Sequence, residues 1–169
     1  MQDLILLHGA LGHPGYFDFI KEALSSQFIV HTPTFYGHAD SVLPIDNRLS
    51  METYIQQLET YCSSRELKQP ALFGYSMGGY VALAYASKFP ERVSSVLTLA
   101  TKLDWSPEIA RKEAIMLDPD TIKAKVPKFA AGLSAVHGSE KWEALTNSVA
   151  QLLTELGAHP ILNAAALAS

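Results

Sequence analysis

The chain has 169 residues, 48% of them apolar and 18% charged, a balance typical of one soluble globular domain with a sizeable core. Its formal net charge is −4 and its 13 lysines and arginines are scattered along the chain, which argues against a nucleic-acid partner. Cys62 is the only cysteine, so a disulfide framework is excluded, and its place in a helical pattern indicates a small core residue.

The first apolar run, residues 4–7, ends at His8-Gly9 and predicts a buried strand of a parallel sheet. It follows an acidic residue and is far too short for a signal peptide or a membrane span. We therefore expect a cytoplasmic protein with no membrane partner.

Strands and helices alternate along the next part of the sequence. Apolar runs predict strands at 28–30, 71–73 and 93–99, and helical spacing predicts helices at 16–24, after Ser50, and at 77–89. Between them, residues 32–49 contain prolines and glycine without periodicity, and such long connections are commonly functional. The alternation predicts a parallel sheet covered by helices on both faces.

The pattern changes after residue 103, because nothing further is typical of a strand. Helix starts are predicted at Ser106-Pro107, Asp118-Pro119, Pro127 and Ser139. Residues 1–103 are therefore expected to form an α/β core, and residues 104–169 a mainly helical segment.

Gly74-Tyr75-Ser76-Met77-Gly78 matches the pattern G-x-S-x-G. The motif follows a predicted strand and opens a predicted helix, which holds a nucleophilic serine on a strained turn flanked by glycines. The backbone N–H of Met77 then lies at the helix N-terminus, where an oxyanion is stabilised. The alternative is that Ser76 only caps the helix.

A second motif, His8-Gly9-Ala10-Leu11-Gly12, directly follows the first predicted strand. Glycine allows the chain to turn closely over a site, so the N–H of Ala10 is predicted to be the other oxyanion donor. An ordinary loop turn is the alternative for this motif taken alone.

These two motifs, with Gly37-His38-Ala39-Asp40-Ser41 between them, resemble the α/β-hydrolase family in order and spacing over residues 4–100. The helical segment after them resembles the family's cap. The resemblance implies an α/β-hydrolase-type parallel sheet flanked by helices, with a helical cap. The predicted strands correspond to the third through sixth strands of the family sheet, so we expect an incomplete sheet.

By this resemblance Ser76 is the nucleophile, and the amides of Ala10 and Met77 form the oxyanion hole. The family's acid and histidine follow a seventh and an eighth strand, and neither strand is visible in the sequence. We therefore expect the chain to be a truncated part of a longer protein, with the acid and the base outside it. Inside the chain, Asp104 is weighed as the acid, and His137 or His159 as the base.

The other histidines are predicted to have structural roles, with His8 in the oxyanion loop and His38 fixing its own loop by hydrogen bonds. The six histidines show no metal-ligand spacing, so no metal is predicted, and acyl transfer needs no cofactor. Apolar side chains are proposed to line a substrate pocket, although those in the helical segment also fit simple core positions: Leu11, Tyr75, Trp105, Met116, Leu117, Phe129 and Trp142.

The sequence thus predicts a serine hydrolase acting by acyl transfer on a small, largely apolar ester, thioester or related carbonyl compound. Two alternatives stay open. One is a lyase or carbon–carbon hydrolase on the same site, because fold does not fix chemistry. The other is a non-catalytic ligand-binding module of the same fold.

Overall fold

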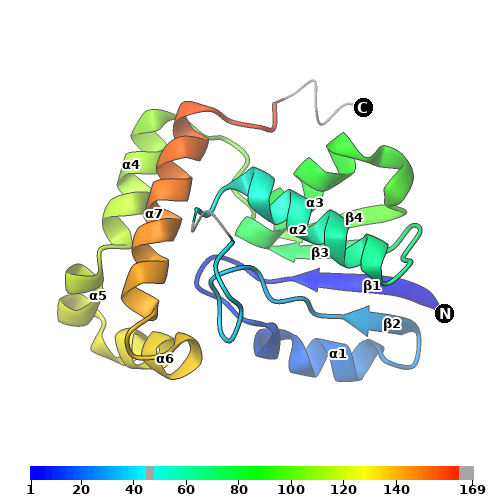
Figure 1. Cartoon of the computed structure of the whole chain (residues 1–169), viewed down its shortest axis with the longest axis horizontal. Helices are drawn as coiled ribbons and strands as arrows, with labels where there is room; N and C mark the ends of the chain where they lie inside the picture. The colour runs from blue at the N-terminus through cyan, green and yellow to red at the C-terminus, as the bar shows by residue number, and fades with distance from the viewer. Residues whose placement is uncertain (45–47, 164–169) are drawn as a thin grey trace.

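The computed structural model of the chain describes residues 1–44 and 48–163, and its centre is one parallel sheet (Figure 1). The strands are β1 (Gln2–Leu7), β2 (Phe28–His31), β3 (Ala71–Tyr75) and β4 (Ser95–Leu99), in the order β2-β1-β3-β4. Leu7 is paired with Gly74, and Gly74 with Thr98, so the carboxyl ends of the three strands lie at one edge of the sheet. The four described strands form the parallel sheet that the sequence predicts.

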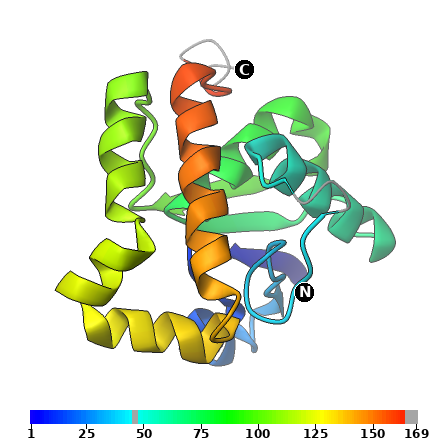
Figure 2. The same ribbon diagram turned by 60° about the vertical axis from the view of Figure 1, so that its left-hand side comes forward.

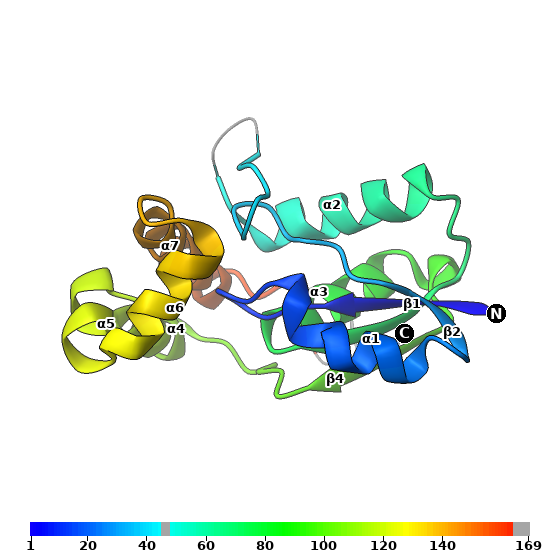
Figure 3. The same cartoon turned by 90° about the horizontal axis from the view of Figure 1, so that it is seen from below.

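Helices lie on both faces of the sheet because the side chains of β1 alternate between two apolar clusters. Ile5 and Leu7 pack in the main core with α2 (Met51–Ser64) and α3 (Met77–Lys88). Leu4 and Leu6 pack in a smaller core with the short 3-10 helix η1 (Pro14–Phe17) and α1 (Asp18–Leu24). Figure 3 shows α2 and α1 on opposite sides of the strands.

The prediction that the whole sheet is covered on both faces is wrong at β4. The side chains of Leu97 and Leu99 are 66% and 56% exposed, and β4 has a neighbour on one side only, β3. The helices α1, α2 and α3 cover the central strands, and no described element packs over these two leucines. The sheet therefore ends in an apolar edge strand.

A layer of four helices lies beyond the carboxyl edge of the sheet (Figures 1 and 2). They are α4 (Pro107–Met116), α5 (Pro119–Lys125), α6 (Pro127–His137) and α7 (Trp142–Ala158). α4 and α7 pack closely, and glycine at position 157 permits this, since a Cβ atom there would lie only 2.3 Å from the Cβ of Ala110. These helices occupy the part of the chain that was expected to form a cap.

Side-chain caps start three of the predicted helices at the expected residues. Ser50, Ser106 and Asp118 accept hydrogen bonds from the third amide of α2, α4 and α5 respectively. The predicted start at Ser139 is wrong, because Gly138, at φ +93°, opens a turn whose carbonyl accepts from the amide of Trp142. α7 begins only there, without a side-chain cap.

Cys62 is fully buried in the main core, and burial raises the pKa of its thiol to about 11. Within residues 1–44 and 48–163, no helix has the length and apolar character needed to cross a bilayer.

Candidate active site

Ser76 occupies the sharp turn between β3 and α3. Its backbone has φ 53° and ψ −117°, a left-handed conformation that is strained for any residue with a side chain. The flanking glycines make the turn possible. A Cβ atom at Gly74 would lie 2.3 Å from the Cα of Gly79, and one at Gly78 would lie 2.2 Å from the carbonyl oxygen of Leu7.

Hydrogen bonds to the segment around the end of β4 hold this strained turn in place. The amide of Ser76 donates to the carbonyl of Leu99 at 2.9 Å, and the hydroxyl of Thr101 donates to the carbonyl of Ser76 at 3.0 Å. The neighbouring strand thus over-determines the conformation of the serine, which is how strained residues persist at functional sites.

The loop at residues 8–12 lies directly against Ser76. A Cβ atom at Gly9 would be 3.2 Å from the Cβ of Ser76, so glycine permits the close approach. Within the described residues, the amide N–H groups of Ala10 and Met77 have no hydrogen-bond acceptor. Both residues line the cavity in front of Ser76, so two unpaired donors and the serine share one space.

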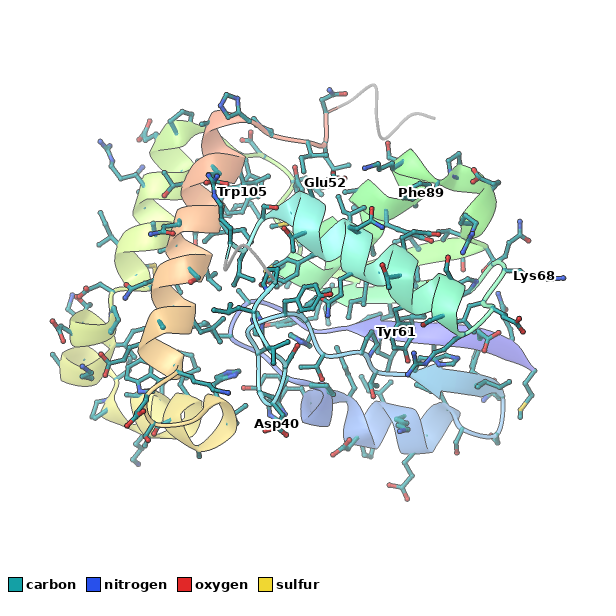
Figure 4. The ribbon with its side chains drawn as sticks, in the orientation of Figure 1. Asp40, Glu52, Tyr61, Lys68, Phe89 and Trp105 are labelled. Atoms are coloured by element: carbon teal, nitrogen blue, oxygen red, sulfur yellow. The ribbon has the colours of Figure 1, made fainter. Side chains whose placement is uncertain are left out.

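This cavity has a volume of about 460 Å³ and lies between the sheet edge and the helical layer. Most of its lining is apolar, and Lys102 and Glu113, which form an ion pair, bring charge to it. Figure 4 shows Trp105 where the helical layer meets the core, near the start of α2. The complete lining is Ala10, Leu11, Met51, Ser76, Met77, Tyr80, Ala100, Lys102, Trp105, Glu113, Met116, Leu117, Phe129, Leu153 and Leu156.

Two of the proposed pocket residues lie elsewhere. Trp142 is 4% exposed and packs in the main core, with the ammonium group of Lys123 over its ring, so it does not line the cavity. Tyr75 is the last residue of β3, and its ring packs beside Gly9 instead of lining the cavity. The proposed residues that do line it are Leu11, Trp105, Met116, Leu117 and Phe129.

Sequence reasoning did not select several lining residues on α2, α3 and α7. Met51, Tyr80, Leu153 and Leu156 look like ordinary core positions of amphipathic helices, and only the packing of the helical layer against the core gives them a cavity. Their helical spacing predicts that they are buried, but it does not distinguish residues that line a pocket from residues that fill the core.

Three histidines near the site are buried, and the two ring nitrogens of each are hydrogen-bonded to the backbone. His8 and His38 lie next to each other, with ring centroids 4.9 Å apart. Burial is the main cause that lowers the pKa of His8 to about 4 and of His38 to about 3. His137, at the end of α6, also has a lowered pKa, mainly because of burial. His38 bonds the carbonyl of Tyr36, and so fixes its loop as expected.

No described histidine or acid completes the site at Ser76. His137 uses both ring nitrogens on backbone groups of other loops, and His159 is exposed at the end of α7, outside the cavity lining. Asp104 is exposed and does not line the cavity either. The hydroxyl of Ser76 has no hydrogen-bond partner in the described part of the chain. Nor do those residues include a group of His, Cys, Asp or Glu side chains suited to a metal ion.

Comparison with known proteins agrees with this geometry. Residues 4–159 match the family model for the alpha/beta hydrolase fold. The chain is 30% identical over 109 residues to a pimeloyl-[acyl-carrier protein] methyl ester esterase of Nitrosomonas europaea, covering 61% of this chain and 41% of the esterase. It is 28% identical over 97 residues to a (lyso)-N-acylphosphatidylethanolamine lipase of Bos taurus, covering 56% of this chain and 28% of the lipase.

Among solved structures, NosK from Streptomyces actuosus has a TM-score of 0.82 at 20% identity, covering 99% of this chain and 72% of NosK. MenH from S. aureus has a TM-score of 0.68 at 21% identity, covering 88% of this chain and 65% of MenH. The matched part of the chain spans less than half the length of the esterase and of the lipase. From its sheet, its strained serine turn and the family match over residues 4–159, the chain belongs to the alpha/beta hydrolase fold family.

Proposed function

We propose that this chain carries the nucleophile and the oxyanion hole of a serine hydrolase that acts by acyl transfer. The observation that carries the proposal is the shared cavity of Ser76 and two unpaired amides, those of Ala10 and Met77. Backbone N–H groups inside a protein normally have partners, so two unpaired donors on residues that line one cavity are suited to an external acceptor.

In the proposed reaction, the Ser76 oxygen attacks the carbonyl carbon of the substrate. The carbonyl oxygen becomes an oxyanion, which accepts hydrogen bonds from the amides of Ala10 and Met77. The positive N-terminal end of α3 adds to this stabilisation. Donors of this kind contribute about 3–4 kcal/mol each to lowering the barrier. Loss of the alcohol or thiol leaves an acyl ester on Ser76, which water then hydrolyses.

Attack requires a base that accepts the hydroxyl proton of Ser76 and then gives it to the leaving alcohol or thiol. The same base takes a proton from the water that attacks the acyl ester and returns it to the Ser76 oxygen. His8, His38 and His137 have no ring nitrogen to spare, so the proposal assigns this base to a group outside the described residues.

The cavity favours a small acyl compound with an apolar body. Its volume of about 460 Å³ is within the range of small-molecule sites, and most of the lining is aliphatic or aromatic. One matched relative is named an esterase and another a lipase, which supports ester chemistry. We therefore propose an ester or thioester as substrate.

The test is covalent labelling of the natural gene product that contains this sequence with a fluorophosphonate. We expect one adduct, mapped to Ser76 by peptide mass spectrometry, and turnover of p-nitrophenyl butyrate. Ser76→Ala should abolish both. Ser148→Ala, which removes a hydroxyl bonded within α7 on a half-buried residue outside the cavity lining, is the matched control and should change neither.

A non-catalytic ligand-binding module is the second candidate, because no described histidine contacts Ser76. In that case the wild-type protein would take up no fluorophosphonate and turn over no ester, but would bind a small apolar ester in a thermal-shift titration. Absence of both labelling and binding would contradict both candidates.

A further inference from the structure

The buried histidines join three segments that are far apart in the sequence. His8 follows β1, His38 belongs to the 32–50 connection, and His137 ends α6 in the helical layer. Ring centroids are 4.9 Å apart for His8 and His38, and 5.8 Å apart for His38 and His137. These histidines lie beside the oxyanion loop, but the proposed mechanism gives them no role.

The hydrogen bonds fix where each proton lies. The Ala39 amide donates to Nδ1 of His137 at 2.8 Å, so Nδ1 carries no proton and Nε2 must carry it. Nε2 then donates to the carbonyl of Leu11 at 3.0 Å. In the same way Nε2 of His38 accepts from the Leu11 amide at 3.2 Å. Both rings are neutral, in agreement with the lowered pKa values that burial gives them.

Leu11 is thus held from two sides. Its backbone has φ +57°, a left-handed conformation unfavourable for a leucine, so it persists only under restraint. His38 binds its N–H from the core, and His137 binds its C=O from the helical layer. Figure 4 shows Asp40, the residue after the Ala39 donor, at the tip of the 32–50 connection on the side of α6.

We propose that His137 is a positioning residue through which the helical layer sets the oxyanion loop. The Leu11 carbonyl shares its peptide with the Gly12 N–H, which donates at 3.0 Å to the carbonyl of Gly9. That carbonyl shares its peptide with the Ala10 N–H, the proposed oxyanion donor. The bond from His137 to the Leu11 carbonyl therefore helps to fix the direction of the Ala10 N–H through this turn. The loop has its catalytic shape only when α6 is docked. This inference rests on the proposed function, because it assigns a role in the same oxyanion hole.

Two substitutions separate the two bonds of His137. His137→Asn keeps an oxygen near the place of Nδ1 for the Ala39 amide, but its side chain is too short to reach the Leu11 carbonyl. His137→Gln puts an amide N–H near the place of Nε2 and restores a donor to Leu11. His159→Asn removes an exposed imidazole at the end of α7 and is the matched control.

The activity readout is the hydrolysis of p-nitrophenyl butyrate by the natural gene product. We expect His137→Asn to lower kcat by about tenfold or more, because an oxyanion donor is misplaced and not removed. KM should stay within about twofold, since His137 does not line the cavity. His137→Gln should regain most of kcat. Equal kcat in His137→Asn and wild type, or a loss that His137→Gln does not reverse, would overturn the inference.

A second readout does not need turnover. Amide hydrogen exchange at Leu11 and Gly12 should become faster in His137→Asn and stay unchanged in His159→Asn. Unchanged exchange in His137→Asn would overturn the positioning role. If the two variants show this exchange pattern but the wild-type protein takes up no label at Ser76, the proposed function fails while the link between α6 and the loop stands.

Discussion

Acid should destabilise the folded chain well before its carboxylates are protonated. His8 and His38 are 1% and 0% exposed, and burial lowers their pKa values to about 4 and about 3 from 6.5. Between those values and 6.5 the unfolded chain binds more protons than the folded chain, so the free energy of unfolding falls as the pH falls. The stability that the two neutral rings contribute is complete above about pH 7.5.

The magnitude follows from the unfolded pKa of about 6.5, because the folded rings stay almost unprotonated down to pH 5. Each ring then loses about 2 kcal/mol of stability between pH 8 and pH 5, and the pair about 4 kcal/mol. His137, whose pKa is also lowered, acts in the same direction. The free energy of unfolding of a domain of this size is only about 5–15 kcal/mol, so the loss is a large share of its stability.

Urea unfolding at pH 8, 7, 6 and 5, followed by tryptophan fluorescence and circular dichroism, measures the effect. His38→Gln removes one titrating group and leaves a side-chain oxygen for the Leu11 amide. Between pH 8 and pH 5 this variant should therefore lose about 2 kcal/mol less of its free energy of unfolding than wild type. His159→Asn should behave like wild type. A wild-type loss below about 1 kcal/mol would refute the assignment of buried neutral rings.

Three further outcomes are expected. Gly78→Ala should lower the free energy of unfolding, measured with urea, by about 3 kcal/mol or more, because a Cβ would lie 2.2 Å from the last carbonyl of β1. Gly132→Ala, in a helix and with open space around it, should raise the same free energy by about 0.5–1 kcal/mol. Tyr80→Phe should lower stability by about 1–3 kcal/mol, because its hydroxyl accepts two amide hydrogen bonds after α7; an unchanged urea midpoint would contradict this. Lys102→Met should lower kcat/KM for an ester with a free carboxylate about two- to fivefold relative to a neutral ester, because Lys102 is the cation among the described cavity residues, paired with Glu113. If the ratio of kcat/KM for the two esters is the same in Lys102→Met and in wild type, that role is contradicted.

Local sequence signals predicted much of the fold. The caps at Ser50 and Ser106 and the G-x-S-x-G turn depend on neighbouring residues, and these features lie where the sequence placed them. Ser76 takes the strained conformation that the flanking glycines predict. A short motif contains its own physical cause, so its structure follows from a few consecutive residues.

Features that depend on how the helices pack were not predictable in the same way. His137 was weighed as a catalytic base, but it bonds the carbonyl of Leu11, 126 residues earlier in the chain. Trp142 was proposed for the pocket as an apolar residue of the expected cap, and it is buried in the main core instead, with Lys123 of α5 over its ring. The apolar pattern of a helix gives the face that is buried. It does not give the partner that buries it.

The order of the strands has a consequence during synthesis. β1 lies between β2 and β3, so it gains its second neighbour only after residues 71–75 have been made. At about 5–20 residues per second, this delay of about 70 residues lasts on the order of several seconds. During that time the apolar residues 4–7 of β1 stay open to other chains. Slower translation lengthens this exposure, so the yield of folded protein should depend on chaperones that bind short apolar segments.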